Sequence, residues 1–310
     1  MTQPAPATDA CPVCSNRLSP YLLGVKDHVT GQQFDVLKCP ACGVGITHPF
    51  PEQLQPHYDG YYGSRHGMTA NYCARRRIAL VTKMVGPGQG RRLLDVGCGD
   101  GTFLRVARGN GWKAMGTELN PEPARRLGFE VFSSLDECAA HAPFSCVTLW
   151  HSLEHMSDPQ LVIAKIRQLI ADDGIVFIAV PDFDGLQSRA FRASWLHLDV
   201  PRHLYHFTAT SLDRVLNQAE LAPVAHWHQE FEYDLIGWLQ SALNAILPTP
   251  NVLFDFLARK KTRGTLLDKI VSGVAVPFVS FVSVPLVWLG TLTRSGGTLL
   301  VAARTAEGRW

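Results

Sequence analysis

A glycine-rich turn between residues 93 and 101 constrains the fold of this chain more than any other feature. The sequence there reads LLDVGCGDG, so an apolar run that contains an acid leads into glycines at every second position. The residues that follow, Thr102 to Arg108, carry apolar side chains at helical spacing. Glycine tolerates positive φ and leaves the backbone bare, so a ligand can lie against the turn at the N-terminus of the helix. The segment therefore predicts a strand, a tight ligand-binding turn and a helix.

A second strand is predicted from Trp112 to Thr117, and an acid, Glu118, follows it. An acid about 20 residues after such a turn can accept hydrogen bonds from both ribose hydroxyls of a nucleoside. The glycine spacing is G-x-G-x-G, whereas a dinucleotide-binding dehydrogenase would need G-x-G-x-x-G.

The turn and Glu118 resemble the corresponding motifs of class I S-adenosylmethionine-dependent methyltransferases, and the resemblance covers roughly residues 75–231 and the last strand. It implies that the amino-acid end of the cofactor lies over Gly97 and Gly99. It also implies that Asp95 orders the loop and that Glu118 holds the ribose. The family often has an acid directly after the third strand for the adenine amine, and here the acid, Asp136, is displaced. The remaining residues expected to bind the cofactor are Gly101, Leu119 and Trp150.

Four of the eight cysteines form two C-x2-C pairs near the N-terminus: Cys11, Cys14, Cys39 and Cys42. Two such turns can direct four thiolates at one tetrahedral ion, which predicts a structural zinc ribbon. The alternatives are loose thiols or a site that has lost its metal. Four thiolates leave no open position for water, so a catalytic zinc is not expected.

Strands and helices alternate along the rest of the core. Further strands are expected near residues 130–132, 145–150, 175–180, 224–231 and 298–303, with helices over 159–171 and 211–218. This alternation predicts an α/β fold with a doubly wound, seven-stranded Rossmann-like methyltransferase sheet, an N-terminal zinc ribbon and a late apolar helical insertion. The expected domains are the ribbon (1–50), a linking helical segment (51–90) and the methyltransferase domain (91–310). The tyrosines of the linking segment, Tyr58, Tyr61 and Tyr62, either line the cofactor entrance or pack on the surface.

The segment HSLEH, residues 151–155, follows the fourth strand and has three readings. The inverted zinc-peptidase motif belongs in a long helix and needs another ligand, so it fits poorly here. In the second reading, Glu154 and His155 only hydrogen-bond the loop. The third rests on a resemblance to ubiquinone-biosynthesis O-methyltransferases, in which an acid, a glutamate and a histidine bind magnesium; His151 replaces the first acid here. A histidine near neutral pKa is suited to remove a substrate proton, so we expect His151 and His155 to be catalytic.

A second polar stretch, WLHLDVPRHLYHFT over residues 195–208, lies beyond the fifth strand and resembles the active-site lining of zinc-ribbon methyltransferases. We expect Arg202 to bind an anionic group of the acceptor, and His203 or His206 to be an alternative base. Trp195 and Asp182 are expected to contact the acceptor. In the alternative, this is a loop whose histidines cap the helix that follows.

An apolar insertion, residues 235–292, separates the last two strands. It contains a basic cluster (Arg259, Lys260, Lys261, Arg263 and Lys269) and a run from Ile270 to Leu292 without a charge. The run could span a bilayer, but one crossing would separate two strands that pair in one sheet, and Pro277 and Pro285 break a straight helix. We therefore expect a bent or paired segment in one leaflet, with Trp238 and Trp288 near the interface, beside a lipid-linked acceptor. The alternatives are a buried helical subdomain or a dimer face.

Composition narrows the remaining choices. A formal net charge of +2 and 46% hydrophobic content describe a globular chain and argue against a nucleic-acid partner. The first ten residues lack the features of a signal peptide, so a cytoplasmic location is expected, with possible attachment to the inner face of the membrane. The predicted function is methylation of an oxygen or carbon of a small or lipid-linked acceptor by in-line transfer with a histidine base. The alternatives are a sugar C-methyltransferase acting on a soluble nucleotide-sugar, and a non-catalytic protein or RNA modifier that binds the cofactor.

Overall fold

The fold is described from a computed structural model that covers residues 10–58, 69–258 and 264–305. Its centre is a seven-stranded sheet in the order β10-β11-β8-β7-β4-β5-β6. The strands from β6 to β8 are parallel, and β11 runs antiparallel to both β8 and β10. The strand bounds are β4 Arg92–Val96, β5 Lys113–Thr117, β6 Val131–Phe132, β7 Phe144–Trp150, β8 Ile170–Pro181, β10 Leu221–Trp227 and β11 Thr298–Thr305. The doubly wound sheet expected from the sequence is confirmed.

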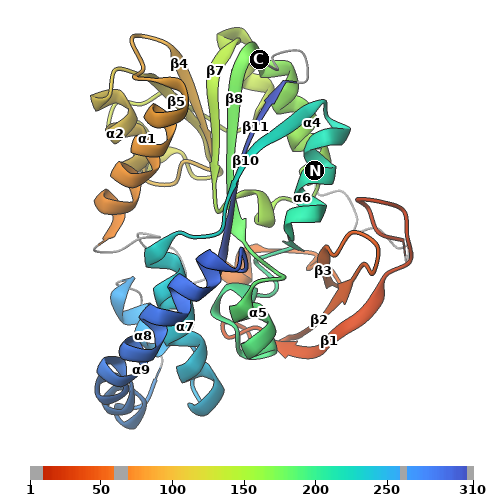
Figure 1. Cartoon of the computed structure of the whole chain (residues 1–310), viewed down its shortest axis with the longest axis vertical. Coiled ribbons are helices and arrows are strands. Elements are labelled where there is room, and N and C mark those ends of the chain that lie inside the picture. The colour runs from red at the N-terminus through yellow and green to blue at the C-terminus, as the bar shows by residue number, and fades with distance from the viewer. Residues whose placement is uncertain (1–9, 59–68, 259–263, 306–310) are drawn as a thin grey trace.

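Helices cover both faces of this sheet (Figure 1). Leu93 and Leu94 are neighbours in β4, so their side chains point to opposite faces of the sheet. Both side chains are fully buried, so each face must be covered. Leu93 packs in a cluster with the first pair of helices and Leu94 in a cluster with the second pair. The first pair is α1 (Ala70–Val85) and α2 (Thr102–Gly109), and the second is α4 (Pro159–Leu169) and α6 (Ala209–Gln218). Shorter helices are α3 (Glu122–Arg125) and α5 (Leu186–Phe191).

The N-terminal cysteine segment forms a second sheet in the order β1-β2-β3-β9. Three of its strands belong to the segment: β1 (Ser19–Lys26), β2 (Gln33–Lys38) and β3 (Gly45–His48). The fourth, β9 (Tyr205–His206), comes from the middle of the methyltransferase sequence, and Ile46 pairs with Tyr205. The ribbon predicted over residues 1–50 is therefore not a separate body, because a strand of the larger domain completes its sheet.

Three helices connect β10 to β11: α7 (Phe231–Ile246), α8 (Val252–Leu257) and α9 (Leu266–Leu292). Phe231 was expected to end a strand, but it begins α7. The helix α9 is continuous through Pro277 and Pro285, so the expectation that they break it is wrong. A proline removes one hydrogen bond of the helix, which can kink the helix without ending it.

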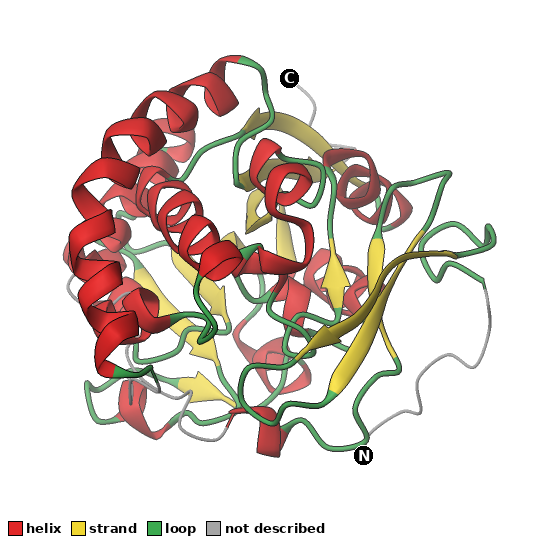
Figure 2. Cartoon of the chain, turned by 90° about the horizontal axis from the view of Figure 1, so that it is seen from below, coloured by secondary structure: helices red, strands yellow, loops and turns green. Residues whose placement is uncertain are grey.

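The insertion and the ribbon lie below the same edge of the large sheet (Figure 1). β8 ends at this edge where β11 begins, because Pro181 pairs with Thr298. It is therefore the edge at which the parallel strands have their carboxyl ends. Seen from below, the helices of the insertion lie on one side and the ribbon strands on the other (Figure 2). This arrangement encloses the part of the sheet where ligands bind in doubly wound folds.

Candidate active site

The glycine turn has the geometry that its sequence predicts. Gly97, Gly99 and Gly101 have φ values of 78°, 56° and 78°, which side-chain-bearing residues rarely adopt. A Cβ at Gly97 would lie 2.7 Å from the Cβ of Ser152, so only glycine fits there. A Cβ at Gly99 would meet no described atom within 4 Å, so this part of the backbone borders open space. The turn thus presents bare backbone to a ligand at the N-terminus of α2.

Two acids lie next to the turn. Asp95 is buried in β4 and accepts a hydrogen bond at 2.7 Å from the hydroxyl of Thr148 in β7, so it joins these two strands. The Glu118 carboxylate, directly after β5, accepts hydrogen bonds from the backbone N–H of Gly99 at 2.9 Å and of Leu119 at 2.8 Å. A carboxylate offers about four lone-pair sites, so about two remain for the hydroxyls of a ribose. The side chain of Leu119 is 89% exposed, so it is accessible to a cofactor.

Trp150 differs from this pattern because its side chain is buried at the end of β7. Its ring packs edge-on against Phe103 and lies 4.9 Å from the guanidinium of Arg77. Arg77 is itself buried on α1. Trp150 therefore packs in the core against α1 and α2.

His151 follows β7 with a φ of 51° and takes part in a buried ionic network. Its Nε2 lies 2.6 Å from Oε2 of Glu230, a fully buried carboxylate immediately before α7. Its ring stacks on Tyr233 with centroids 4.0 Å apart. Burial alone would raise the pKa of Glu230, but Arg77 and His151 hold it well below the usual range. Arg77 forms two hydrogen bonds of 3.0 Å to this carboxylate, so Glu230 is an anion whose acceptor atoms fix the orientation of His151.

No sequence motif indicates that Glu230, Arg77 and Tyr233 belong to this site. They lie on elements far from HSLEH along the chain, at the start of the insertion and in the linking helix. In the sequence, these three residues stand out only as polar side chains next to apolar ones. Ordinary amphipathic helices show the same pattern.

Glu154, His155 and His203 lie together next to His151. The carboxylate of Glu154 is buried, with Oε1 3.8 Å from Nδ1 of His151 and 3.9 Å from Nε2 of His203. One ligand atom from each of Glu154, His155 and His203 lies within 4.8 Å of the others. The structure thus brings HSLEH together with His203, as the two separate motifs predict.

Arg202 has a different role from the expected one. Its guanidinium is fully buried and donates hydrogen bonds to Asp27 at 2.8 Å, to Asp199 at 2.6 Å and to the carbonyl oxygen of His57 at 2.9 Å. Burial alone would raise the pKa of Asp27, but Arg202 and His57 hold it below its usual range. These bonds occupy the guanidinium in joining the ribbon to the domain, so it is not placed to receive an anionic acceptor group.

His206, proposed as an alternative base, also belongs to the contact with the ribbon. It lies in β9, and its Nε2 is 3.0 Å from the Thr47 hydroxyl, which itself donates to the His203 carbonyl oxygen. Thr47 therefore accepts a hydrogen bond from the Nε2–H of His206. Burial lowers the pKa of His206 to about 3, which makes it a weak base.

Trp195 and Asp182 are buried as well. The indole N–H of Trp195 lies 3.3 Å from Oε1 of Gln187, and Asp182 accepts the backbone N–H of Asp184 at 3.0 Å. Both side chains therefore make hydrogen bonds within the chain beyond β8.

The four N-terminal cysteines cluster as the C-x2-C pairs predict. Sγ of Cys11 lies 3.6 Å from that of Cys42, and Sγ of Cys14 lies 3.4 Å from that of Cys39. All four sulfur atoms lie within 4.8 Å of one another.

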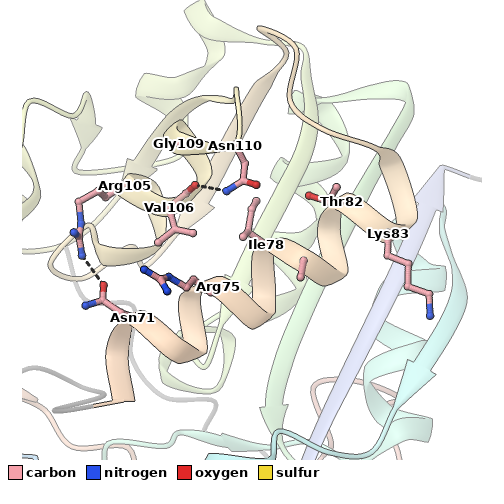
Figure 3. A pocket seen from close by; sticks show the side chains of 10 residues that line it. Asn71, Arg75, Ile78, Thr82, Lys83, Arg105, Val106, Gly109 and Asn110 are labelled. Carbon is pink, nitrogen blue, oxygen red and sulfur yellow. Dashed lines mark hydrogen bonds between the residues drawn. The ribbon is translucent and has the colours of Figure 1, made fainter.

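A groove with a volume of about 810 Å³ lies elsewhere, between α1 and α2 (Figure 3). Arg75, Arg105 and Asn110 are among its lining residues, which come from these helices and the turn after α2. Arg105 is already hydrogen-bonded to Asn71 at 2.6 Å. None of the histidines or turn glycines named above lines this groove, so the site is assigned to the strand ends and not to the groove.

Comparison with known proteins agrees with this geometry. Residues 65–226, just over half of the chain, match a family model described as a methyltransferase domain. Two ubiquinone biosynthesis O-methyltransferases are similar: that of Thiobacillus denitrificans is 32% identical over 105 residues, and that of Salmonella paratyphi A is 33% identical over 121 residues. The matches cover 30% and 35% of this chain and 45% and 50% of the relatives, so the chain spans about half the length of these proteins.

Solved structures give more distant matches. A putative sarcosine dimethylglycine methyltransferase from Galdieria sulphuraria is 12% identical with a TM-score of 0.49, over 75% of this chain and 85% of that one. The match to the cyclopropane synthase MmaA2 from Mycobacterium tuberculosis has 13% identity and a TM-score of 0.47, over 74% and 82%. On the evidence of its turn, its sheet and the family match, this chain belongs to the methyltransferase-domain family.

Proposed function

We propose that the enzyme methylates an oxygen or carbon atom of a small or lipid-linked acceptor, with His151 as the base. The observation that carries this proposal is the 2.6 Å contact between Nε2 of His151 and Glu230. An anionic carboxylate at Nε2 favours a proton there, which leaves Nδ1 as the basic nitrogen. The negative charge of Glu230 also stabilises the imidazolium that forms when Nδ1 takes a proton from the acceptor.

The described residues fit S-adenosylmethionine. Gly97 and Gly99 supply a side-chain-free surface, and Glu118 retains acceptor sites for ribose hydroxyls. When bound, this cofactor supplies an electrophilic methyl group on sulfur. The protein must then align the acceptor in line with that methyl group and exclude water. Tyr233, on α7, packs over His151, which follows β7.

The nature of the acceptor is supported by the relatives and by the insertion. The similar ubiquinone biosynthesis enzymes are O-methyltransferases by name, which favours an oxygen acceptor here. A direct test compares three acceptors: a catechol with a polyprenyl tail, the same catechol without the tail, and a nucleotide-linked keto sugar. We expect turnover to be fastest with the tailed catechol. Turnover of the sugar alone would refute the proposed acceptor and favour the sugar C-methyltransferase alternative.

The base is tested with His151→Asn, because asparagine tolerates the positive φ of this position. General-base catalysis contributes about 10²–10⁴-fold, so kcat should fall by that factor. Affinity for S-adenosylhomocysteine should stay within about twofold, since His151 is not expected to touch the cofactor. The matched control is His226→Asn, at an exposed histidine on β10. A kcat of His151→Asn equal to that of the control would remove His151 from the mechanism.

We also propose that α9 lies in one leaflet of an anionic membrane. Its mean hydropathy is 2.2 over an 18-residue window of which only 17% is buried. Phe278, Phe281 and Leu292 are 73%, 83% and 81% exposed. At about 1.5 Å per residue, α9 is about 40 Å long. A soluble protein rarely exposes apolar side chains along so long a helix. The chain leaves the sheet through α7 and returns through α9, so both flanking strands stay on one side of the bilayer.

Two parts of the earlier expectation change. Trp288 is 54% exposed, but Trp238 is buried against Phe191 and is not an interfacial anchor. The basic cluster from Arg259 to Arg263 lies outside the described residues. The cations that the structure does place near α9 are Lys269 within its first turns and Arg294 just after its end.

Co-sedimentation with vesicles of anionic phospholipid tests the attachment. The double variant Phe278→Ser/Phe281→Ser should lose most binding, because each exposed aromatic side chain contributes roughly 1.5–3 kcal/mol when buried in lipid. The control is Leu23→Ser, which removes an apolar side chain that is 68% exposed on β1 of the ribbon. If wild-type protein does not sediment with vesicles but dimerises through α9, the helix is a dimer face.

We propose, finally, that the four-cysteine cluster holds a structural zinc ion. Burial raises the pKa of the Cys42 thiol to about 11, a cost that a bound divalent cation offsets. Four thiolates saturate a tetrahedral ion, so the site stabilises the ribbon and does not activate water. Metal analysis should find zinc in wild-type protein, and the Cys39→Ser/Cys42→Ser variant should have lost this ion. A wild-type protein without zinc would refute the assignment.

A further inference from the structure

A second cluster of metal-binding side chains lies at the centre of the site. Glu154 and His155 belong to the short turn after β7, and His203 comes from the stretch that precedes β9. All three lie at the meeting point of the two histidine-rich motifs, and Glu154 and His203 are buried. The site would thus combine side chains from two distant parts of the sequence.

Hydrogen bonds to the backbone fix which nitrogen of each imidazole carries the lone pair. Nδ1 of His155 lies 2.8 Å from the carbonyl oxygen of Arg202, and Nδ1 of His203 lies 2.9 Å from that of His197. A carbonyl oxygen can only accept, so both Nδ1 atoms carry hydrogen, and in the neutral imidazole Nε2 then carries the lone pair. This is the pattern in which metal-binding histidines are held, with the nitrogen that does not bind the metal donating to a carbonyl or carboxylate.

The spacing suits an ion with short bonds. Nε2 of His203 lies 3.9 Å from Oε1 of Glu154. A tetrahedral ion with bonds of about 2.0–2.1 Å would separate its ligand atoms by roughly 3.4 Å. All three ligand atoms lie within 4.8 Å of one another, so they need to approach by at most about 1.4 Å to reach this spacing.

Magnesium, which the resemblance to ubiquinone-biosynthesis enzymes implies, suits these residues less well than a transition metal. Magnesium prefers oxygen ligands, and this cluster offers one carboxylate and two imidazoles, which is one carboxylate fewer and one imidazole more than the magnesium site of those enzymes. The residue that replaces the first acid, His151, directs Nε2 at Glu230 instead. Imidazole ligands suit zinc and neighbouring transition metals.

We propose that Glu154, His155 and His203 form a binding site for a divalent transition metal of the zinc class, distinct from the four-cysteine site. Among the described residues, three side chains supply ligands, and three protein ligands are the number found in catalytic zinc sites, whereas structural sites have four. Any part that this site plays in methyl transfer rests on the proposed function. The binding of the ion does not, because it is measured without an acceptor.

Metal content after equilibrium with zinc and removal of excess tests the proposal. Wild-type protein should hold about two zinc ions per chain, one at each site. His203→Asn should hold about one, because the asparagine amide can still donate to the His197 carbonyl oxygen but has no lone pair at the position of Nε2. Glu154→Gln, which keeps the shape and removes the anion, is the second variant. His226→Asn, at an exposed position away from the cluster, is the matched control and should keep two.

Cobalt substitution identifies which site is lost. Cobalt held by four thiolates gives an intense sulfur-to-metal charge-transfer band, and cobalt at the second site should add a weak band without it. His203→Asn should lose only the weak band, with an unchanged circular dichroism spectrum. Two zinc ions retained in both His203→Asn and Glu154→Gln would overturn the proposal. So would one zinc ion in wild-type protein, or displacement of the second cobalt by an equal concentration of magnesium.

Discussion

The substitution Glu118→Ala tests the assignment of the cofactor site without knowledge of the acceptor. In the structure, the Glu118 carboxylate accepts two backbone N–H groups, from Gly99 and Leu119. We expect its two remaining lone-pair sites to accept the ribose hydroxyls. The substitution therefore removes two hydrogen bonds to the ligand and two that hold the loop.

The magnitude follows from the two bonds to the ribose. A hydrogen bond to a charged group contributes about 1.5–3 kcal/mol, and Glu118 is partly exposed, so the lower end applies. Two such bonds give about 3 kcal/mol, and each 1.4 kcal/mol is tenfold in affinity, so binding should weaken by about 100-fold. Glu118→Gln keeps one acceptor oxygen and should weaken it by about tenfold.

Isothermal titration with S-adenosylhomocysteine measures this loss. The control is Glu122→Ala on the neighbouring helix α3, which removes the same charge from a side chain that is 61% exposed. Its affinity should stay within about twofold of wild type, since exposed ion pairs contribute little. If Glu118→Ala bound the ligand within about threefold of the control, with the same thermal unfolding, the ribose assignment would be wrong.

Three further predictions concern residues buried around the site. Gly97→Ala should destabilise the protein by about 1–3 kcal/mol and weaken S-adenosylhomocysteine binding, because its Cβ would lie 2.7 Å from that of Ser152 at a φ of 78°; an unchanged thermal midpoint would contradict this. Glu230→Gln should lower the free energy of unfolding in urea by about 3–5 kcal/mol, because it leaves the buried Arg77 cation without its anion, and a loss below about 1 kcal/mol would count against the network. Burial raises the pKa of Asp234 well above its usual range, so the folded state binds a proton that the unfolded state has released, and this group makes stability fall as the pH rises above about 4. Asp234→Asn should therefore gain stability over wild type at pH 7 but not at pH 4 in chemical denaturation, and an equal difference at both pH values would refute the argument.

The turn and the sheet could be predicted because their signals are local. Alternating glycines after an apolar strand permit few conformations, and the acid after the next strand is fixed in place by the parallel pairing of β4 with β5. The four cysteines carry a comparable local signal. The expected helix over 211–218 and the last strand were close to the observed α6 and β11 for the same reason.

The partners of the histidines could not be predicted because they depend on contacts between distant segments. Nothing in HSLEH indicates that His151 meets Glu230, and nothing around Arg202 indicates that its partner is Asp27 in the ribbon. Both pairs form between elements that the sheet and its insertion bring together. The sequence singled out the residue types that carry chemistry in the second motif, but the structure shows that Arg202 and His206 hold the ribbon in place.

The short pairing of β9 with β3 has a consequence for how the protein is made. The cysteine segment leaves the ribosome before the methyltransferase domain, yet the last strand of its sheet is not available until the chain has been synthesised as far as His206. Likewise, the buried charge of Asp27 is neutralised only after Arg202 has been synthesised. The N-terminal segment should therefore remain incompletely folded through much of translation. It should dock only after the part of the domain that carries Arg202 and β9 has formed.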